Sequence, residues 1–253
     1  MELGLKGLRA IVTGGSKGIG RRCADILAAE GASVGICARN AAEIEETVVA
    51  LKGQGVGVFG KALDVVDKAA LEDWVKASAA ALGGIDIVVA NVSALAVSDD
   101  EDAWHKQFET DMLHTVRTVN AALPWLEKSK APAITVISSV SGREIDFTGP
   151  AYGAIKAALI HYTHGLAYKL APKMIRVNSV SPGNTYFDGG IWQSIERNNP
   201  DFFKQALALN PTGRMATAEE VARGVVFLAS PASSFTTGTN LVIDGALTKG
   251  VQF

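Results

Sequence analysis

The chain reads Thr13-Gly14-Gly15-Ser16-Lys17-Gly18-Ile19-Gly20 directly after its first apolar run, Arg9–Thr13. Glycines in this pattern let the backbone turn sharply at Gly14 and approach a pyrophosphate closely at Gly18. Gly20 allows the following helix to pack against the strand, and the amino end of that helix attracts an anion. Because this turn follows the first strand of a repeating strand–helix chain, it predicts a dinucleotide-binding site.

Apolar runs of strand length alternate with longer helical stretches along most of the chain. The runs are rich in Val and Ile and nearly continuous in hydrophobicity, which is typical of strands buried on both faces of a parallel sheet. The predicted strands are Arg9–Thr13, Ser33–Ala38, Val56–Ala62, Ile85–Ala90, Ala133–Ser138, Ile175–Val180 and Asn240–Ile243. The predicted helices are Ile19–Glu30, Ala41–Gly53, Lys68–Leu82, Ala103–Glu127, Ala151–Ala171 and Ala218–Ser230. We expect one α/β domain, a doubly wound Rossmann-type parallel sheet of about seven strands flanked by helices in three layers.

The composition excludes several classes of function. The chain has 253 residues, 48% of them hydrophobic, and its 24 Lys and Arg against 26 Asp and Glu leave no basic excess for nucleic acid. No apolar run reaches the roughly 18 residues that a membrane helix needs, and the amino end shows no secretory leader. The two cysteines, Cys23 and Cys37, and the four histidines form no disulfide framework and no metal-ligand pattern. We therefore expect a cytoplasmic protein without a metal that binds small molecules.

The end of the second predicted strand bears on the choice of cofactor. An NAD site typically has Asp or Glu there, about 20 residues after the glycines, to bind the ribose 2′-hydroxyl. Ala38 and Arg39 stand in that place, and Lys17 lies within the glycine turn. Two cations without a carboxylate favour a 2′-phosphate, so the sequence predicts NADP(H) rather than NAD(H).

A tyrosine and a lysine share one face of the predicted helix that follows Pro150. Tyr152 and Lys156 are four residues apart, and Ser139 lies thirteen residues before the tyrosine. The ordinary pKa of tyrosine is about 10, and a nearby ammonium group lowers it by favouring the phenolate. A serine hydroxyl can hold a carbonyl oxygen while the tyrosine protonates it. These residues predict proton transfer to or from a substrate oxygen.

Together, the glycine turn, Ser139 and the Tyr152–Lys156 pair resemble the short-chain dehydrogenase/reductase family, in its branch of about 250 residues. The resemblance extends from residue 5 to residue 250. Its further motifs are Leu63-Asp64-Val65, Ser181-Pro182-Gly183, Gly213-Arg214-Met215, Glu219–Ala222, Phe227–Ser230 and Thr237–Gly245. It implies a single domain over 1–253, with a dinucleotide-binding and catalytic core at 5–180, a variable substrate loop at 184–212 and a C-terminal segment at 213–253.

The resemblance also implies a reaction, the transfer of a hydride between nicotinamide and the carbon of a carbonyl or secondary alcohol. Tyr152 is then the expected general acid and base, Ser139 orients the substrate oxygen, and Lys156 holds the cofactor ribose and lowers the tyrosine pKa. The cofactor-binding residues that the resemblance implies are Gly14, Ser16, Lys17, Gly18, Ile19, Gly20, Arg39, Asp64, Val65, Asn91, Tyr152, Lys156, Pro182, Gly183 and Thr185.

The chain departs from the family pattern at several positions. Asp111 stands where the family has a catalytic asparagine, whose role there is to hold a water that relays protons to the lysine. As a catalytic residue, Asp111 either keeps that relay or impairs it, and its charge is expected to raise the pKa of Lys156. Val92 and Ser93 replace small residues beside the cofactor, and Phe187 replaces a threonine near the nicotinamide.

The sequence leaves the substrate open. Aromatic residues within Asn184–Asn210, a stretch expected to be less regular, either close an apolar lid over the site or pack as core beneath a long loop. The leading function is an NADP(H)-dependent carbonyl reductase or alcohol dehydrogenase. A 3-oxoacyl thioester reductase acting on acyl carrier protein is an alternative that a basic patch of Lys128, Lys130 and Arg176 would favour. A protein that senses NADP(H) with little turnover is another, which Asp111 motivates. Because the family is usually dimeric or tetrameric, a homodimer or homotetramer is expected.

Overall fold

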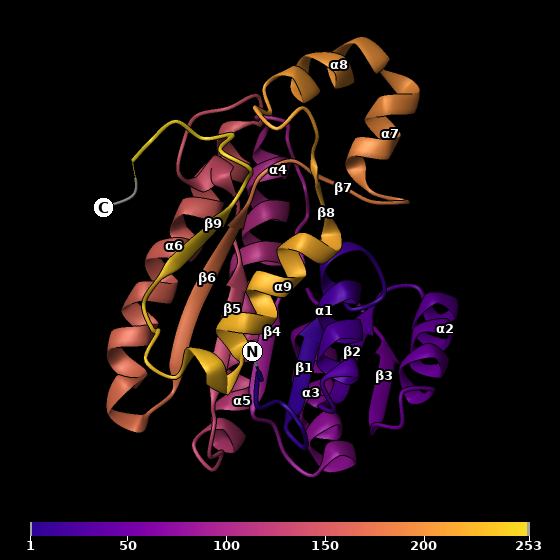
Figure 1. The fold of residues 1–253 in the computed structure, drawn as a ribbon, viewed down its shortest axis with the longest axis vertical. Coiled ribbons are helices and arrows are strands. Elements are labelled where there is room, and N and C mark those ends of the chain that lie inside the picture. Colours follow the sequence, from indigo (N-terminus) through magenta and orange to yellow (C-terminus); the bar gives the residue numbers. More distant parts are fainter. Residues whose placement is uncertain (1, 252–253) are drawn as a thin grey trace.

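The computed structural model describes residues 2–251, and a parallel sheet of seven strands runs through it in the order β3-β2-β1-β4-β5-β6-β9 (Figure 1). The strands are β1 Arg9–Thr13, β2 Ser33–Ala38, β3 Val58–Ala62, β4 Ile87–Ala90, β5 Ala133–Ile137, β6 Arg176–Pro182 and β9 Asn240–Ile243. Every residue of β5 and β6 is buried, as a sheet covered on both faces requires. The predicted doubly wound α/β fold is confirmed.

Helices cover both faces of the sheet. They are α1 Gly18–Ala29, α2 Ala41–Lys52, α3 Lys68–Leu82, α4 Glu101–Gln107, α5 His114–Leu126, α6 Pro150–Leu170, α7 Ile191–Asn198, α8 Pro200–Ala208 and α9 Ala218–Ala229. One core joins the sheet to α1, α2 and α9 through side chains such as Leu27 and Val225. The other joins it to α3, α5 and α6 through Trp74, Val119 and Leu159. The result is a three-layer arrangement.

The predicted helix Ala103–Glu127 is wrong as one continuous element. A π-helical turn, Phe108–Leu113, separates α4 from α5, so the hydrogen-bond pattern widens in the middle of the stretch. Hydrophobic spacing does not reveal such an insertion, because the flanking turns keep a helical period. The consequence concerns the site, since Asp111 lies within this turn and its side chain is fully buried.

The stretch Asn184–Asn210 is more regular than expected. A short strand β7, Thr185–Tyr186, pairs with β8, Ala216–Thr217, and the helices α7 and α8 lie between them. The two helices share a small core of their own, built around Trp192, Ala206 and Met215. Figure 1 shows α7 and α8 standing beyond the carboxyl ends of the large sheet.

The order of the strands sets the position of the site. The chain runs from β1 outward to β3, then returns to β4 on the other side of β1, which leaves a crevice at the carboxyl ends of β1 and β4. Ligands of open α/β sheets bind at such a switch point. Among residues 2–251, no helix is long and apolar enough to cross a membrane, and no group of three or more His, Cys, Asp or Glu is placed to hold a metal ion.

Candidate active site

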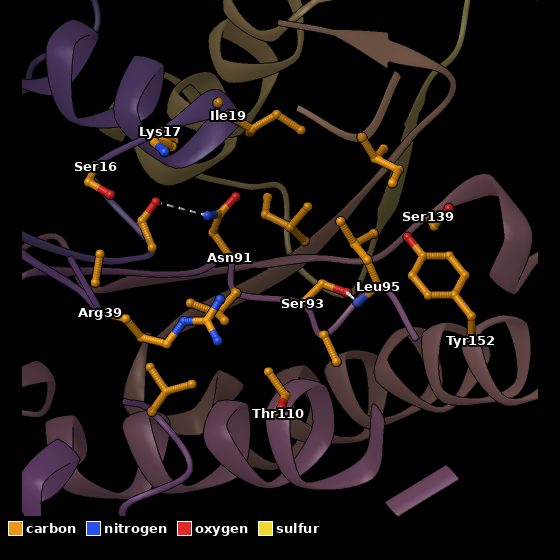
Figure 2. A pocket seen from close by; sticks show the side chains of 18 of the residues that line it. Ser16, Lys17, Ile19, Arg39, Asn91, Ser93, Leu95, Thr110, Ser139 and Tyr152 are labelled. Carbon is orange, nitrogen blue, oxygen red and sulfur yellow. Dashed lines mark hydrogen bonds between the residues drawn. The ribbon is translucent and has the colours of Figure 1, made fainter. Parts of the chain in front are cut away.

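A cleft of about 1150 Å³ opens at this switch point. Its wall contains fifteen of the residues predicted from the sequence: Gly14, Ser16, Lys17, Gly18, Ile19, Arg39, Asp64, Val65, Asn91, Ser139, Tyr152, Lys156, Pro182, Gly183 and Thr185. Gly20 and Asp111 are absent from the wall and lie behind it. The glycine turn, the polar residues after β2 and the Ser–Tyr–Lys set therefore face one common space (Figure 2).

The glycine turn is held by the strands around it. Gly14 donates its backbone N–H to the carbonyl of Cys37 at 2.8 Å, and Gly14 and Gly18 adopt φ values of +67° and +54° that favour glycine. A Cβ at Gly20 would lie 2.3 Å from the carbonyl oxygen of Gly14 and 2.5 Å from Nδ2 of Asn91. Gly20 thus permits close packing inside the turn instead of facing the cleft.

Asn91 ties β4 to the same turn. Its Nδ2 donates to the carbonyl of Thr13 at 3.1 Å, and its backbone N–H donates to Oγ1 of Thr13 at 3.0 Å. Behind them, buried His114 has Nδ1 at 2.6 Å from the carbonyl of Thr110 and Nε2 at 3.0 Å from Oγ1 of Thr13. A carbonyl only accepts, so Nδ1 carries the proton and Nε2 accepts from the threonine hydroxyl. Burial lowers the pKa of His114 to about 4, although nearby Asp111 opposes that shift, so the ring is neutral at pH 7.

Ser139 and Tyr152 stand at the far side of the cleft from Arg39. Helix α6 begins at Pro150, a residue suited to a first helical position, so that Tyr152 lies in its first turn. Figure 2 shows the Tyr152 hydroxyl pointing toward Ser139. The Ser139 hydroxyl donates to Oγ of Ser141 at 3.1 Å, and Ser141 donates to Oδ2 of Asp146 at 2.5 Å. Ser139 is therefore oriented by a short chain of hydrogen bonds.

Lys156 and Asp111 form a buried ion pair beneath the tyrosine. Nζ of Lys156 lies 2.9 Å from Oδ2 of Asp111, 3.2 Å from the carbonyl of Ile137, to which it donates, and 5.5 Å from the centre of the Tyr152 ring. The other carboxylate oxygen of Asp111 accepts the backbone N–H of Ala94 at 2.8 Å. Burial opposes the charge of Lys156, but Asp111 and Tyr152 outweigh it and raise the pKa of Lys156 above its ordinary value. The predicted effect of Asp111 on the lysine pKa agrees with this geometry.

At the opposite end of the cleft, the structure corrects the expectation that no carboxylate accompanies the two cations. Two cations without a carboxylate were the expected surroundings of a 2′-phosphate, yet Glu43 also lines the cleft. Its Oε1 lies 2.7 Å from Nζ of Lys17, and its Oε2 accepts from Ser16 at 3.2 Å. Arg39 reaches into the cleft from the end of β2 (Figure 2) and has no ion-pair partner among residues 2–251.

Sequence reasoning missed Glu43 because it considered only the residues that directly follow β2. A signal was present in the spacing Asn40-x-x-Glu43, in which an asparagine at a helix start is followed three residues later by a glutamate. Thr13 and His114 were also missed. Their contact joins residues 101 positions apart, and no local pattern announces it.

Aromatic side chains close the remaining side of the cleft. The lining here consists of two aromatic residues, Phe187 and Trp192, and the aliphatic Ile191. A Cβ at Gly18 would lie 2.6 Å from the ring of Phe187. The Phe147 ring, from the segment between Ser139 and Tyr152, packs edge-on against Trp192 with ring centres 5.5 Å apart. The aromatic residues thus both form the core of α7 and α8 and face the site.

Comparisons with known proteins agree with the geometry. A family model described as enoyl-(acyl carrier protein) reductase matches residues 14–248. The isoepoxydon dehydrogenase of Penicillium expansum is 38% identical over 100% of this chain and 99% of its own. The 3-oxoacyl-[acyl-carrier-protein] reductase of Chlamydia pneumoniae is 31% identical over 98% of this chain and 100% of its own.

Two solved structures are similar over nearly their whole length. L-sorbose reductase from Gluconobacter frateurii, in complex with NADPH and L-sorbose, has a TM-score of 0.91 and 28% identity, covering 99% of this chain and all of that one. A 7α-hydroxysteroid dehydrogenase in complex with NADH has a TM-score of 0.90 and 27% identity, with 97% and 96% of the two chains covered.

Fold, cleft and relatives together define a nicotinamide-dependent oxidoreductase of the α/β class. The chain belongs to the short-chain dehydrogenase/reductase family, whose members act on alcohol and carbonyl groups. The cleft fits the dinucleotide that this membership implies, because the glycine turn lines it, with cationic Arg39 and Lys17 at one end and Ser139 and Tyr152 at the other (Figure 2).

Proposed function

We propose that this protein is an NADP(H)-dependent oxidoreductase that interconverts a ketone and a secondary alcohol, with Tyr152 as its general acid and base. One observation carries the proposal: Ser139, Tyr152 and Lys156 line the same cleft as the glycine turn and Arg39. The nicotinamide, when bound, supplies or accepts the hydride.

The roles of the side chains follow from their contacts. In reduction, Tyr152 donates its hydroxyl proton to the substrate oxygen, while Ser139 holds that oxygen by a hydrogen bond. The ammonium of Lys156, 5.5 Å from the Tyr152 ring, stabilises the phenolate that remains. In oxidation the same phenolate takes the proton of the alcohol. Asp111 weakens the stabilisation of the phenolate by Lys156, because its carboxylate neutralises part of the lysine charge.

The preference for NADP(H) rests on the cations at the adenosine end of the cleft. Arg39 has no competing ion pair within residues 2–251, and a guanidinium binds a phosphate by two parallel hydrogen bonds. Asp64, Val65 and Asn91 also line the cleft. NADPH in the similar L-sorbose reductase supports the preference, while NADH in the 7α-hydroxysteroid dehydrogenase is the competing case.

We further propose that the segment 184–212 selects a small, compact substrate. Trp192 is 6% exposed and lines the cleft together with Ile191, so apolar side chains bound part of the space open to a substrate. The names of two relatives, isoepoxydon dehydrogenase and L-sorbose reductase, are consistent with a small oxygenated substrate.

The structure does not favour a thioester bound to acyl carrier protein. Arg176 is buried and donates to the carbonyls of Leu228 and Ser230, so it contributes nothing to a basic surface. Lys128 and Lys130 precede β5 and therefore lie at the amino ends of the strands, away from the cleft. The three cations named by the alternative do not gather beside the site.

The proposal is tested by NADPH oxidation with L-sorbose, a 7-oxosteroid and an acetoacetyl thioester, and by NADP+ reduction with isoepoxydon. We expect turnover with a small ketone and little with the thioester. Preferred turnover of the thioester would replace the proposed substrate class. Tight NADPH binding without turnover of any compound would favour the sensing function, for which the Asp111–Lys156 pair is the specific observation.

We also propose that the protein is a homodimer or homotetramer. Tyr168 on α6 and Phe235 ahead of β9 are 88% and 102% exposed, and contact between copies would remove such apolar surface from water. Light scattering is expected to give the mass of a dimer or tetramer, and a monomeric mass would contradict this.

A further inference from the structure

The adenosine end of the cleft contains a carboxylate that faces the two donors of the glycine turn. Glu43 has Oε1 at 2.7 Å from Nζ of Lys17, and its Oε2 accepts from Oγ of Ser16 at 3.2 Å. All three residues line the cleft. Glu43 is thus part of the surface that a dinucleotide meets at this end.

The carboxylate is held in place by its own helix. Asn40 caps the amino end of α2 by accepting the backbone N–H groups of Ala42 and Glu43, and its Nδ2 donates to Oε1 of Glu43 at 2.8 Å. Although burial opposes its charge, Lys17, Ser16 and Asn40 outweigh burial and lower the pKa of Glu43 below its ordinary value. Glu43 is therefore ionised at neutral pH.

These contacts engage donors that a phosphate needs. A serine hydroxyl has one proton to donate, and that of Ser16 points to Glu43. Lys17 is half exposed, with 55% of its side chain accessible, so its ammonium can turn toward another anion. A phosphate that binds Lys17 and Ser16 must draw them from Glu43, and its charge then lies near a carboxylate. A ribose hydroxyl is uncharged and meets no such opposition.

We propose that Glu43 is a specificity-determining residue that weakens the preference for NADP(H) over NAD(H) by competing with the 2′-phosphate for Lys17 and Ser16. The inference rests on the proposed function, in which Arg39 favours NADP(H). It adds Glu43 as a residue that acts against this preference. Glu43 thereby lets NAD(H) compete for a site built with two cations.

A different role for Glu43 predicts the opposite result. If the carboxylate only oriented Lys17 for the phosphate, its loss would weaken NADPH binding. If it competes, its loss tightens NADPH binding and leaves NADH unchanged. The sign of the change therefore separates the two roles.

The experiment measures dissociation constants of NADPH, NADH, 2′-AMP and 5′-AMP for the wild type, Glu43→Gln and Glu45→Gln. Glu45 is exposed on the same helix, two residues away and so on another face, and its variant makes the same change in net charge. For Glu43→Gln we expect about tenfold tighter binding of NADPH and 2′-AMP, with NADH and 5′-AMP changed less than about twofold. Unchanged or weaker NADPH binding by Glu43→Gln would overturn the inference.

A second pair of variants gives an independent test if the amide at position 43 perturbs the cap of α2. Lys17→Met is introduced into the wild type and into Glu43→Asp, whose shorter side chain moves the carboxylate away from residue 17. Competition predicts that Lys17→Met costs less NADPH affinity in the wild type than it does beside Glu43→Asp, and equal losses would contradict it. The ratio of NADPH affinity to NADH affinity in the wild type tests the proposed cofactor. The change in that ratio between the wild type and a Glu43 variant tests the role of Glu43, so the two proposals can fail separately.

Discussion

Lys156 and Asp111 form an ion pair with Nζ and Oδ2 2.9 Å apart and with 2% and 0% of the two side chains exposed. Asp111 reaches this position from the π-helical turn between α4 and α5, and it is anchored on its other oxygen by the N–H of Ala94. Because the pair lies beneath Tyr152, it sets how strongly the lysine charge acts on the phenol.

The first prediction concerns Asp111→Asn. In the proposed function the ammonium of Lys156 stabilises the phenolate of Tyr152, and Asp111 supports that ammonium by raising the pKa of Lys156. Asp111→Asn removes the group that opposes the effect of burial on the ammonium, so it is expected to lower the pKa of Lys156 and to move the alkaline limb of the pH profile of kcat/KM to lower pH. The neighbouring titratable group His114 is neutral across the range measured.

Exposed Asp99 supplies the control, since Asp99→Asn makes the same change in net charge outside the buried site. An alkaline limb that stays in place or moves to higher pH in Asp111→Asn would count against a lysine charge maintained by the pair.

The second prediction concerns stability in acid. Burial lowers the pKa of His114 from 6.5 to about 4, so the folded protein binds this proton less readily than the unfolded chain. The stability that depends on the neutral ring is fully present above pH 6.5 and is lost as the pH falls toward 4. The loss amounts to about 3 kcal/mol. His114→Gln removes the titration and is expected to flatten the curve of unfolding free energy against pH in this window. Parallel curves for wild type and variant would contradict the assignment.

The third prediction compares two glycines. A Cβ at Gly20 would lie 2.3 Å from the carbonyl oxygen of Gly14, whereas a Cβ at Gly165 on α6 meets nothing within 4 Å. Gly20→Ala is expected to lower the melting temperature and to weaken cofactor binding, because the backbone of the turn must move. Gly165→Ala is expected to stabilise the protein by about 0.5–1 kcal/mol. Thermal denaturation of both variants checks this, and a Gly20→Ala protein as stable as the wild type would contradict the packing.

The fourth prediction concerns Arg39. Arg39→Ala removes the guanidinium that the proposed function pairs with the 2′-phosphate, a group that NADH lacks. We expect the dissociation constant of NADPH to rise about tenfold and that of NADH to stay within about twofold. Fluorescence titration at fixed ionic strength measures both, and equal losses for the two cofactors would show that Arg39 does not discriminate between them.

Much of the scaffold was predictable because its signals are local. The bounds of β1, β2 and α3 agree with the prediction, since continuous Val and Ile runs define the strands and Asp67 caps α3. The glycine turn, Ser139 and Tyr152 follow strands or begin helices, so they meet at the carboxyl edge of the sheet once the strands are parallel.

The positions of Asp111, Glu43 and the helices α7 and α8 depended on contacts that no local pattern encodes. The π-helical turn adds a residue without disturbing the helical period on either side, and it carries Asp111 toward Lys156 from 45 positions away in the chain. Glu43 enters the site through a side chain that reaches from α2 to the glycine turn. Helices α7 and α8 pack mainly on each other, around Trp192. They are only 8 and 9 residues long and are separated at Asn199, so the stretch contains no long periodic run.

The proposed role of Tyr152 as general acid and base is tested most directly by measuring turnover and NADPH affinity of Tyr152→Phe beside the wild type. The phenylalanine keeps the ring against Lys156 and removes only the hydroxyl that is proposed to exchange the proton. Turnover of every substrate accepted by the wild type is expected to fall by at least about 100-fold, with the dissociation constant of NADPH changed less than about threefold. Near-normal turnover by Tyr152→Phe would contradict the role of Tyr152 as general acid and base.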